Sequence, residues 1–349
     1  MALVLVFTAV AALVVVAGPA NDVDDVAVYH AAASPRGDPV TVTVDAGAAT
    51  DEIANSLKSS GAIGSASQFR VLVALLGYDR LLQPGEYEFA RETPELETVY
   101  RIRNGIVSSK SVTVVEGFRL EEIADAVAAQ GIDGTKFLAA ARRGDYQFPF
   151  LEDLRVGQRL DGYLFPAKYP IRKRDTGRDV VQRMLQGFAD NVPSSVAEQA
   201  SAQGLTLHEV VTLASIIERE AVVPEERPIM AQVFLKRLSL GVALEADPTV
   251  QYAVANDQAS VNRYGYWKKE LTLEDLEISS PYNTRVESGL PPGPICSPGL
   301  DSINAVVNPA NTNYQFFVAK PDGSHAFAET FQEHLENIQQ YGGDVGTPP

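Results

Sequence analysis

A glutamate inside an apolar helical stripe is the first feature of this sequence that could do chemistry. Residues 206–221 predict a helix, because Thr206 and Glu209 have the spacing of an N-terminal capping box. At 100° per residue one face of this helix is apolar, formed by Leu207, Val210, Val211, Ala214, Ile217 and Ala221. Glu218 falls within that face, whereas Glu209 and Glu220 are expected to point to solvent. Burying a carboxylate is costly, so Glu218 is either a general acid with a raised pKa or the partner of a buried arginine.

The next expected helix, residues 228–240, carries an arginine for the structural alternative. Arg237 shares the apolar face of that helix with Ile229, Met230 and Val233. A tight ion pair with Arg237 would lower the pKa of Glu218 and make it a poor proton donor. We therefore expect Arg237 to support the fold by pairing with another acid, and we favour Asp247 over Glu226.

The remaining reactive residues exclude several other kinds of site. The four histidines have no metal-ligand spacing, and a single cysteine, Cys296, allows neither an intrachain disulfide nor a cysteine-based zinc site. We expect no metal and no cofactor. The formal net charge of −16 argues against a nucleic-acid partner, because phosphate binding requires a basic face. An uncharged or zwitterionic polymer remains an acceptable partner.

The 349-residue chain is long enough for two or three domains. Residues 1–18 are uncharged and mostly Ala, Val and Leu, and as a helix they would span roughly 27 Å, close to a bilayer core. We expect a membrane anchor here, with a cleaved secretory signal as the alternative. Residues 19–39 predict a linker, and residues 342–349 a frayed tail. The rest of the chain is then expected on the extracytoplasmic side of the cell membrane.

A repeat with an offset of 70 residues organises the chain after the linker. The segment Val42–Gly47, followed by Glu52-Ile53-Ala54, recurs as Val112–Gly117, followed by Glu122-Ile123-Ala124. Each copy predicts a strand, a glycine turn and an amphipathic helix. The first copy, within residues 40–106, resembles the LysM-like module, a peptidoglycan-binding fold, although a generic strand–turn–helix is the alternative. The second unit is expected at residues 111–141.

Beyond the repeat, ordered motifs resemble the YceG-like family, the endolytic murein transglycosylases. The helix that contains Glu218 reads LASIIERE over residues 213–220. The other matching segments, in order, are Leu160–Pro166, Val233–Leu238, Asp247–Tyr252, Ser280–Ile295 and Gly323–His334. The resemblance covers about residues 40–341.

This resemblance implies an α+β fold, in which a small LysM-like module follows a membrane helix and precedes a mixed α+β catalytic region at residues 107–341. The implied reaction cleaves the bond between N-acetylmuramic acid and N-acetylglucosamine in nascent peptidoglycan, which would terminate glycan elongation. The product ends in 1,6-anhydro-muramic acid because the C6 hydroxyl of the sugar attacks C1. One carboxylate can serve this reaction, whereas hydrolysis usually needs two. Peptidoglycan synthases are candidate partners.

The resemblance also implies roles for individual residues. The catalytic glutamate of the family maps onto Glu218. Sugar ligands or loop braces are expected at Asp247, Tyr252, Asn283, Thr284 and His325. Tyr163 and Arg237 are expected to support the site, and residues 289–294 to form one wall of a groove. Arg285 stands where the resemblance would imply an aromatic residue after Asn283-Thr284. This difference affects the expected local contacts with the substrate and not the expected reaction.

Two rival functions remain open at this point. A non-catalytic peptidoglycan-binding scaffold would use the repeat for adhesion, although it has no need for a buried acid. A hydrolytic muramidase would use Asp247 or Glu245 as its second carboxylate.

Overall fold

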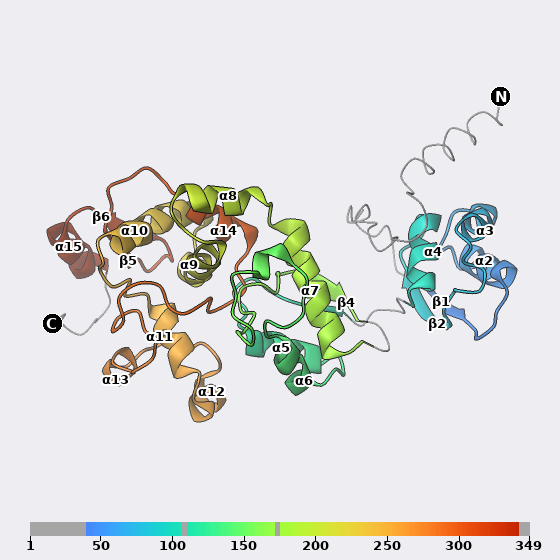
Figure 1. Ribbon diagram of the computed structural model, residues 1–349, viewed down its shortest axis with the longest axis horizontal. Coiled ribbons are helices and arrows are strands. Elements are labelled where there is room, and N and C mark those ends of the chain that lie inside the picture. Colours follow the sequence, from blue (N-terminus) through green and yellow to red (C-terminus); the bar gives the residue numbers. More distant parts are fainter. Residues whose placement is uncertain (1–39, 106–110, 172–174, 342–349) are drawn as a thin grey trace. The chain divides into compact units, whose positions relative to one another are not determined.

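The computed structural model describes residues 40–105, 111–171 and 175–341 (Figure 1). The expected membrane helix, linker and frayed tail lie outside these residues. No helix within the described ranges is long and apolar enough to cross a membrane. The chain divides into two compact units, Met1–Ser109 and Lys110–Pro349, and each is described by itself.

Over residues 40–105 the first unit contains two strands and three helices: β1 (Val40–Val44), α2 (Thr50–Ser59), α3 (Ala66–Leu75), β2 (Gly85–Phe89) and α4 (Glu95–Arg103). β1 pairs with β2 in antiparallel fashion, with Val42 opposite Tyr87. Alternate residues of β1 are buried, as the period of its sequence predicts. The buried side chains form a core of their own that includes Val42, Ile53, Leu57, Phe69, Tyr87 and Ile102.

The second copy of the repeat opens the larger unit and keeps the same order of elements. It consists of β3 (Ser111–Thr113), α5 (Leu120–Ala128), α6 (Gly134–Ala140) and, further along, β4 (Lys168–Pro170), which pairs antiparallel with β3. Gly47 and Gly117 occupy equivalent turns with φ angles of +82° and +81°, which a residue with a Cβ rarely adopts. This copy packs into the core of the larger unit.

Helix α9 (Leu207–Glu220) lies against several helices of the larger unit. Helices α8, α10, α11 and α14 contact α9, and Figure 1 shows α8, α10 and α14 gathered around it. The helix bounds are α7 (Gly177–Asn191), α8 (Ser195–Ala202), α10 (Arg227–Ser239), α11 (Asp247–Val254), α12 (Gln258–Tyr264), α13 (Leu273–Leu276) and α14 (Leu300–Val307), with short 3₁₀ turns η1 (Pro149–Leu151) and η2 (Pro224–Glu226).

Helix α9 begins with the expected capping box. The Thr206 hydroxyl accepts a hydrogen bond from the Glu209 backbone N–H, and the Glu209 carboxylate accepts one from the Thr206 N–H at 2.7 Å. Every residue from Val210 to Ile217 is buried. The helix is therefore covered on all sides and has no solvated face along this stretch, unlike the half-buried helix that the apolar stripe suggested.

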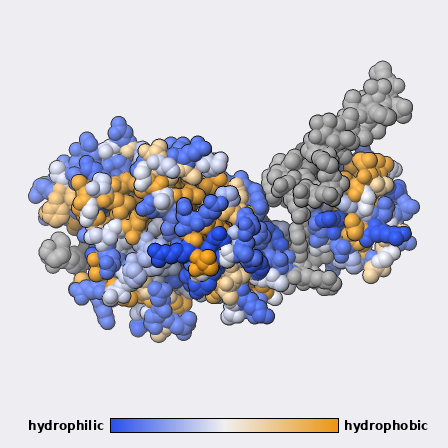
Figure 2. All heavy atoms as spheres, viewed as in Figure 1, coloured by the Kyte–Doolittle hydropathy of each residue, from blue (hydrophilic) through white to orange (hydrophobic). Residues whose placement is uncertain are grey.

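A hairpin and a helix complete the larger unit. Strands β5 (Phe316–Ala319) and β6 (His325–Ala328) pair antiparallel, and α15 (Phe331–Tyr341) contacts both strands. The described residues thus form a mixed α+β fold with three two-stranded sheets, which confirms the expected class. On the face shown in Figure 2, hydrophilic and apolar residues are interspersed over both units. A mixed surface is typical of folded domains and assigns no function.

Candidate active site

The last turn of α9 carries three charged side chains that meet three different surroundings. Glu218, Arg219 and Glu220 succeed one another in the sequence, so their side chains leave the helix about 100° apart. Glu218 contacts the start of α14, Arg219 lies over Trp267, and Glu220 is influenced by Asp247.

Glu218 is buried, as its place in the apolar stripe predicts, with 6% of its side chain exposed. Its Oε2 atom accepts hydrogen bonds from the Gly299 backbone N–H at 2.9 Å and from the Ser302 hydroxyl at 2.7 Å. Gly299 is the N-cap of α14, where the first backbone N–H groups of a helix have no partner within the helix. Glu218 therefore caps α14, and its negative charge complements the positive end of that helix.

A second carboxylate and an arginine accompany Glu218 at this helix terminus. Arg227 places an Nη2 atom 3.7 Å from Oε1 of Glu218. Burial and the charge of Glu218 raise the pKa of Glu116, while Arg227 opposes the shift. A Cβ added to Gly299 would overlap the Glu116 carboxylate, so Glu116 also lies against the start of α14. The sequence pattern identified Glu116 only as part of the repeat.

Glu220 lies in different surroundings, and the expectation that it points freely to solvent is wrong. Part of the residue remains accessible, but loss of solvation raises the pKa of its carboxyl group to about 8. The negative charge of Asp247 contributes to this rise, and Arg285 opposes it. A helical wheel could not show this, because the neighbouring groups come from α11 and from a loop far along the chain. A carboxyl group whose pKa is raised in this direction is suited to donate a proton near neutral pH.

Asp247 and Arg285 form an ion pair beside Glu220. The Nη2 and Nε atoms of Arg285 donate to Oδ1 of Asp247 at 2.7 and 3.0 Å. The two side chains are 35% and 51% exposed for Arg285 and Asp247, so the pair is accessible to a ligand. Asp247 is the first residue of α11, where the helix terminus also favours a negative charge. Arg285 departs from the family pattern, but its partner Asp247 belongs to one of the matching segments.

The predicted pairing of Arg237 with Asp247 is wrong. Arg237 instead forms an ion pair with Glu245, and its Nε donates to the Ala243 carbonyl at 2.7 Å. Its Nη1 reaches the Gln315 carbonyl at 3.4 Å, just before β5. The prediction weighed Asp247 against Glu226 and missed Glu245. Asp247 begins α11 and pairs with Arg285 instead. Arg237 thereby holds the loop after α10 against the start of the hairpin.

Two other predicted residues brace the loop that carries Arg285. Asn283 is buried, and its Nδ2 donates to the carbonyls of Leu276 and Ile278 at 2.9 Å each. The Thr284 hydroxyl is also buried, accepts from the Ala246 N–H at 3.1 Å and lies 2.8 Å from the Thr249 hydroxyl. These contacts connect the loop to the start of α11, and so hold Arg285 next to Asp247.

Tyr252 and Tyr163 belong to buried aromatic contacts. Tyr252 lies 4.7 Å from Tyr282 between ring centroids, and the guanidinium of Arg119 lies 4.3 Å from its ring. The Tyr163 hydroxyl is 3.0 Å from Nδ1 of His208, whose Nε2 is 3.1 Å from the Pro292 carbonyl. Tyr163 therefore connects, through a histidine of α9, to the segment expected to form a groove wall.

His325 lies in a separate pair. Its Nδ1 is 2.7 Å from Oε2 of Glu226, and its backbone N–H donates to Oε1 of the same residue at 3.0 Å. The side chain is buried at the start of β6. These contacts connect the hairpin to η2, and no contact described for His325 involves Glu218 or Glu220.

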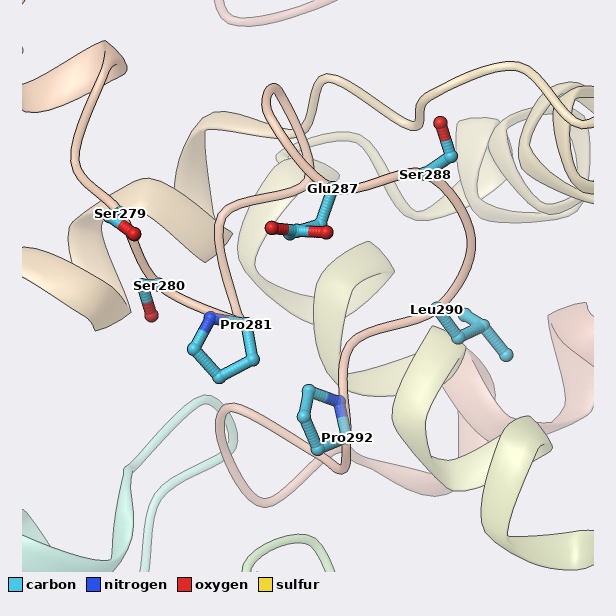
Figure 3. A pocket seen from close by; sticks show the side chains of 7 residues that line it. All are labelled: Ser279, Ser280, Pro281, Glu287, Ser288, Leu290 and Pro292. Atoms are coloured by element: carbon cyan, nitrogen blue, oxygen red, sulfur yellow. The ribbon is translucent and has the colours of Figure 1, made fainter.

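The loop that carries Arg285 also lines a cavity of about 420 Å³. Figure 3 shows Glu287 among the side chains around this cavity, together with Pro281 and Pro292. Leu290 and Pro292, from the expected groove wall, are among the lining residues. Within the described part of the chain, no group of three or more His, Cys, Asp or Glu residues is placed to hold a metal ion.

These features define a class of protein: an α+β fold in which a buried helix presents a carboxyl group of raised pKa beside an accessible ion pair. A solved YceG-like protein from Listeria monocytogenes has a similar fold, with a TM-score of 0.57 and 27% identity, covering 85% of this chain and 98% of that chain. The sequence matches the YceG-like family over residues 42–340. This chain belongs to the YceG-like family.

Two relatives with known names are similar over most of this chain. The endolytic murein transglycosylase of Bacillus subtilis (strain 168) is 30% identical, over 86% of this chain and 84% of the relative. The endolytic murein transglycosylase of Streptococcus pneumoniae serotype 2 (strain D39) is 27% identical, over 86% of this chain and 58% of the relative.

Proposed function

We propose that this chain is an endolytic lytic transglycosylase that cleaves the glycan strands of peptidoglycan, with Glu220 as its acid. Membership of the YceG-like family and the names of the two relatives support the reaction and the substrate. The observation that carries the assignment to Glu220 is its carboxyl group, whose pKa is raised to about 8 beside the accessible pair of Asp247 and Arg285. A group with this pKa is protonated at neutral pH and can still lose its proton during the reaction.

The reaction that we propose needs one such group. Glu220 donates its proton to the oxygen that links N-acetylmuramic acid to N-acetylglucosamine, and the bond from this oxygen to C1 breaks. The C6 hydroxyl of the same muramic acid attacks C1 and closes the 1,6-anhydro ring. The Glu220 carboxylate then accepts the proton of that hydroxyl, so no water is consumed and the acid is regenerated. In this proposal Asp247, held by Arg285, stabilises the positive charge that develops at C1.

Glu218 is the acid predicted from the sequence, and it stays the alternative to Glu220. Its hydrogen bonds to Gly299 and Ser302 favour a structural role, because a carboxylate that caps a helix N-terminus is held in place by donors. In our proposal Glu218 positions α14 against α9. The two glutamates then share a helix turn and differ in function.

The first unit and the N-terminal segment have proposed roles of their own. The separate core of residues 40–105 supports a module that acts independently, and we infer that it is a LysM-like unit that binds peptidoglycan. Residues 1–18 are proposed as the anchor that keeps the enzyme at the cell membrane, with peptidoglycan synthases as partners there. Deleting residues 40–106 should then weaken binding to intact peptidoglycan more than it slows cleavage of short soluble glycans.

Product analysis tests the reaction. Purified glycan strands are incubated with the full chain, and the products are reduced with labelled borohydride. Mass spectrometry then gives the masses of the released fragments. A transglycosylase gives fragments that are lighter by one water than hydrolysis products and that have no reducible end at the cleaved bond. A hydrolase with Asp247 as second carboxylate would leave reducible ends, and a scaffold would leave the strands intact. Either of these last results would refute the proposal.

A further inference from the structure

Trp267, the only tryptophan of the chain, is held rigidly in the loop after α12. Its Nε1 donates to the Glu122 carboxylate of α5 at 2.9 Å, and the hydroxyl of the neighbouring Tyr266 donates to Asp125 of α5 at 2.8 Å. From the other side, Gln251 of α11 donates to the Lys268 carbonyl at 2.9 Å. Three hydrogen bonds to two helices therefore fix the loop and the orientation of the indole ring.

The indole also contacts the helix turn that carries the two glutamates. The guanidinium of Arg219 lies 4.0 Å from the centre of the indole, a cation–π contact. Arg219 stands between Glu218 and Glu220 in the sequence and packs closely against Gly117. Through Arg219, the indole ring thus contacts the helix turn that carries Glu220, the proposed acid.

The loop that carries the indole is accessible to solvent in part. Trp267 remains partly exposed although its polar atom is satisfied and Arg219 covers part of the ring. Tyr264, three residues earlier, is 43% exposed. A fixed, partly exposed indole suits a sugar, because the C–H groups on one side of a pyranose ring pack against the electron-rich face of an aromatic ring. The uncharged hydroxyls of the sugar stay hydrated, so the contact requires no charged partner.

We propose that Trp267 is a stacking platform for one pyranose ring of the glycan strand. The subsite would lie next to Arg219, the residue that precedes Glu220 on α9. This inference rests on the proposed function, since it assigns a sugar subsite to the same enzyme. It makes Trp267 a binding residue that affects affinity for the strand more than the chemical step.

A fluorescence titration tests the contact directly, because tryptophan emission from this chain reports on Trp267 alone. The probe is the β-1,4-linked N-acetylglucosamine hexamer, which has the backbone of the strand without its lactyl groups. We expect a saturable change in emission of the full chain. Calorimetry in parallel reports binding by an independent signal. Binding seen by calorimetry with unchanged emission, or no binding at millimolar hexamer, would overturn the platform.

Kinetics of variants distinguish a binding role from a structural one. Trp267→Ala is expected to raise KM for glycan strands roughly tenfold with kcat changed less than about twofold, and Trp267→Phe should recover most of the affinity. The matched control is Phe331→Ala, which removes a 56% exposed ring from α15 and should leave both constants unchanged. A loss of kcat and melting temperature without a rise in KM would show that Trp267 only supports the fold. If the wild-type chain cleaves no strands, the proposed function fails, while the titration still decides whether Trp267 binds sugar.

Discussion

The last turn of α9 carries two glutamates, Glu218 and Glu220, whose surroundings differ. On the side of α14, Glu218 accepts hydrogen bonds from Gly299 and Ser302 and lies near Arg227. On the side of α11, Glu220 loses solvation and faces the negative charge of Asp247, which raises its pKa to about 8. Both side chains are largely withdrawn from water. In our proposal, the donors and charges around each carboxyl group, and not its burial alone, distinguish the structural role of Glu218 from the acid role of Glu220.

The largest expected effect separates the two glutamates by activity. Glu220→Gln should lower strand cleavage by about 10²-fold or more, because glutamine keeps the shape of the side chain but has no proton to donate. Glu218→Gln should retain most of the activity, measured per folded molecule. The measurement is the initial rate of fragment release, with melting temperature recorded for both proteins. A folded but inactive Glu218→Gln beside an active Glu220→Gln would reverse the comparison and restore the assignment made from the sequence.

The second prediction concerns how stability depends on pH on the Glu220 side. The folded pKa of about 8 lies above the ordinary value of a glutamate, so the native state binds more protons between those two pKa values. The stability that this group contributes is therefore present at low pH and is lost as the pH rises toward 8 and above. Glu220→Gln removes the titration, and it should be about 1–3 kcal/mol more stable than the wild type at pH 9 and nearly equal to it at pH 5.

Glu218→Gln is the control for this prediction. It weakens the anionic cap of α14 and should destabilise the protein at pH 9, with no gain over the wild type there. Denaturant titrations of the three proteins at both pH values provide the free energies of unfolding. If Glu220→Gln gains nothing at pH 9, the Glu220 carboxyl group is not desolvated in the native protein.

A third, smaller effect tests the charges that face Glu220. Asp247→Asn removes a negative charge that raises the pKa of Glu220, so the alkaline limb of the pH–rate profile should move to lower pH by about one unit. Arg285→Met removes the opposing positive charge, and the same limb should move to higher pH. The profile of kcat/KM between pH 5 and 10 measures both shifts. Shifts in the same direction, or none, would show that the ion pair does not act on the acid.

The local pattern of the sequence predicted much of the fold. The repeat, the capping box of α9 and the main helices follow from periodicity and turn residues, which act over a few positions of the chain. The orientation of Glu218 followed from the same helical wheel. The surroundings of Glu220 did not, because Asp247 and Arg285 reach it through the packing of α11 and a loop more than sixty residues further on. Glu220 lies in the same family motif as Glu218, and that motif was the only sequence signal for it.

The two copies of the repeat also show that local sequence patterns do not predict long-range packing. Their strands, glycine turns and first helices are alike in sequence, and the structure builds both as strand, two helices and strand. The first copy encloses its own core, whereas the second joins the core around α9. Its residues Glu116, Gly117 and Glu122 thereby reach Glu218, Arg219 and Trp267. Periodicity could predict each unit, but not which of them would become part of the site.

The smallest expected effect concerns Arg237, and it tests whether Asp247 belongs with Glu220 or with α10. Arg237 pairs with Glu245, whose side chain is 54% exposed, so solvent weakens the interaction. A double-mutant cycle of Arg237→Met and Glu245→Gln should give a coupling energy of about 0.5–1 kcal/mol. The matched cycle of Arg237→Met with Asp247→Asn should give about zero, because Asp247 is bound by Arg285. Free energies of unfolding for the single and double variants measure both couplings. A larger coupling to Asp247 than to Glu245 would place that aspartate beside Arg237, and Glu220 would then lose the charge that distinguishes its side of α9 from that of Glu218.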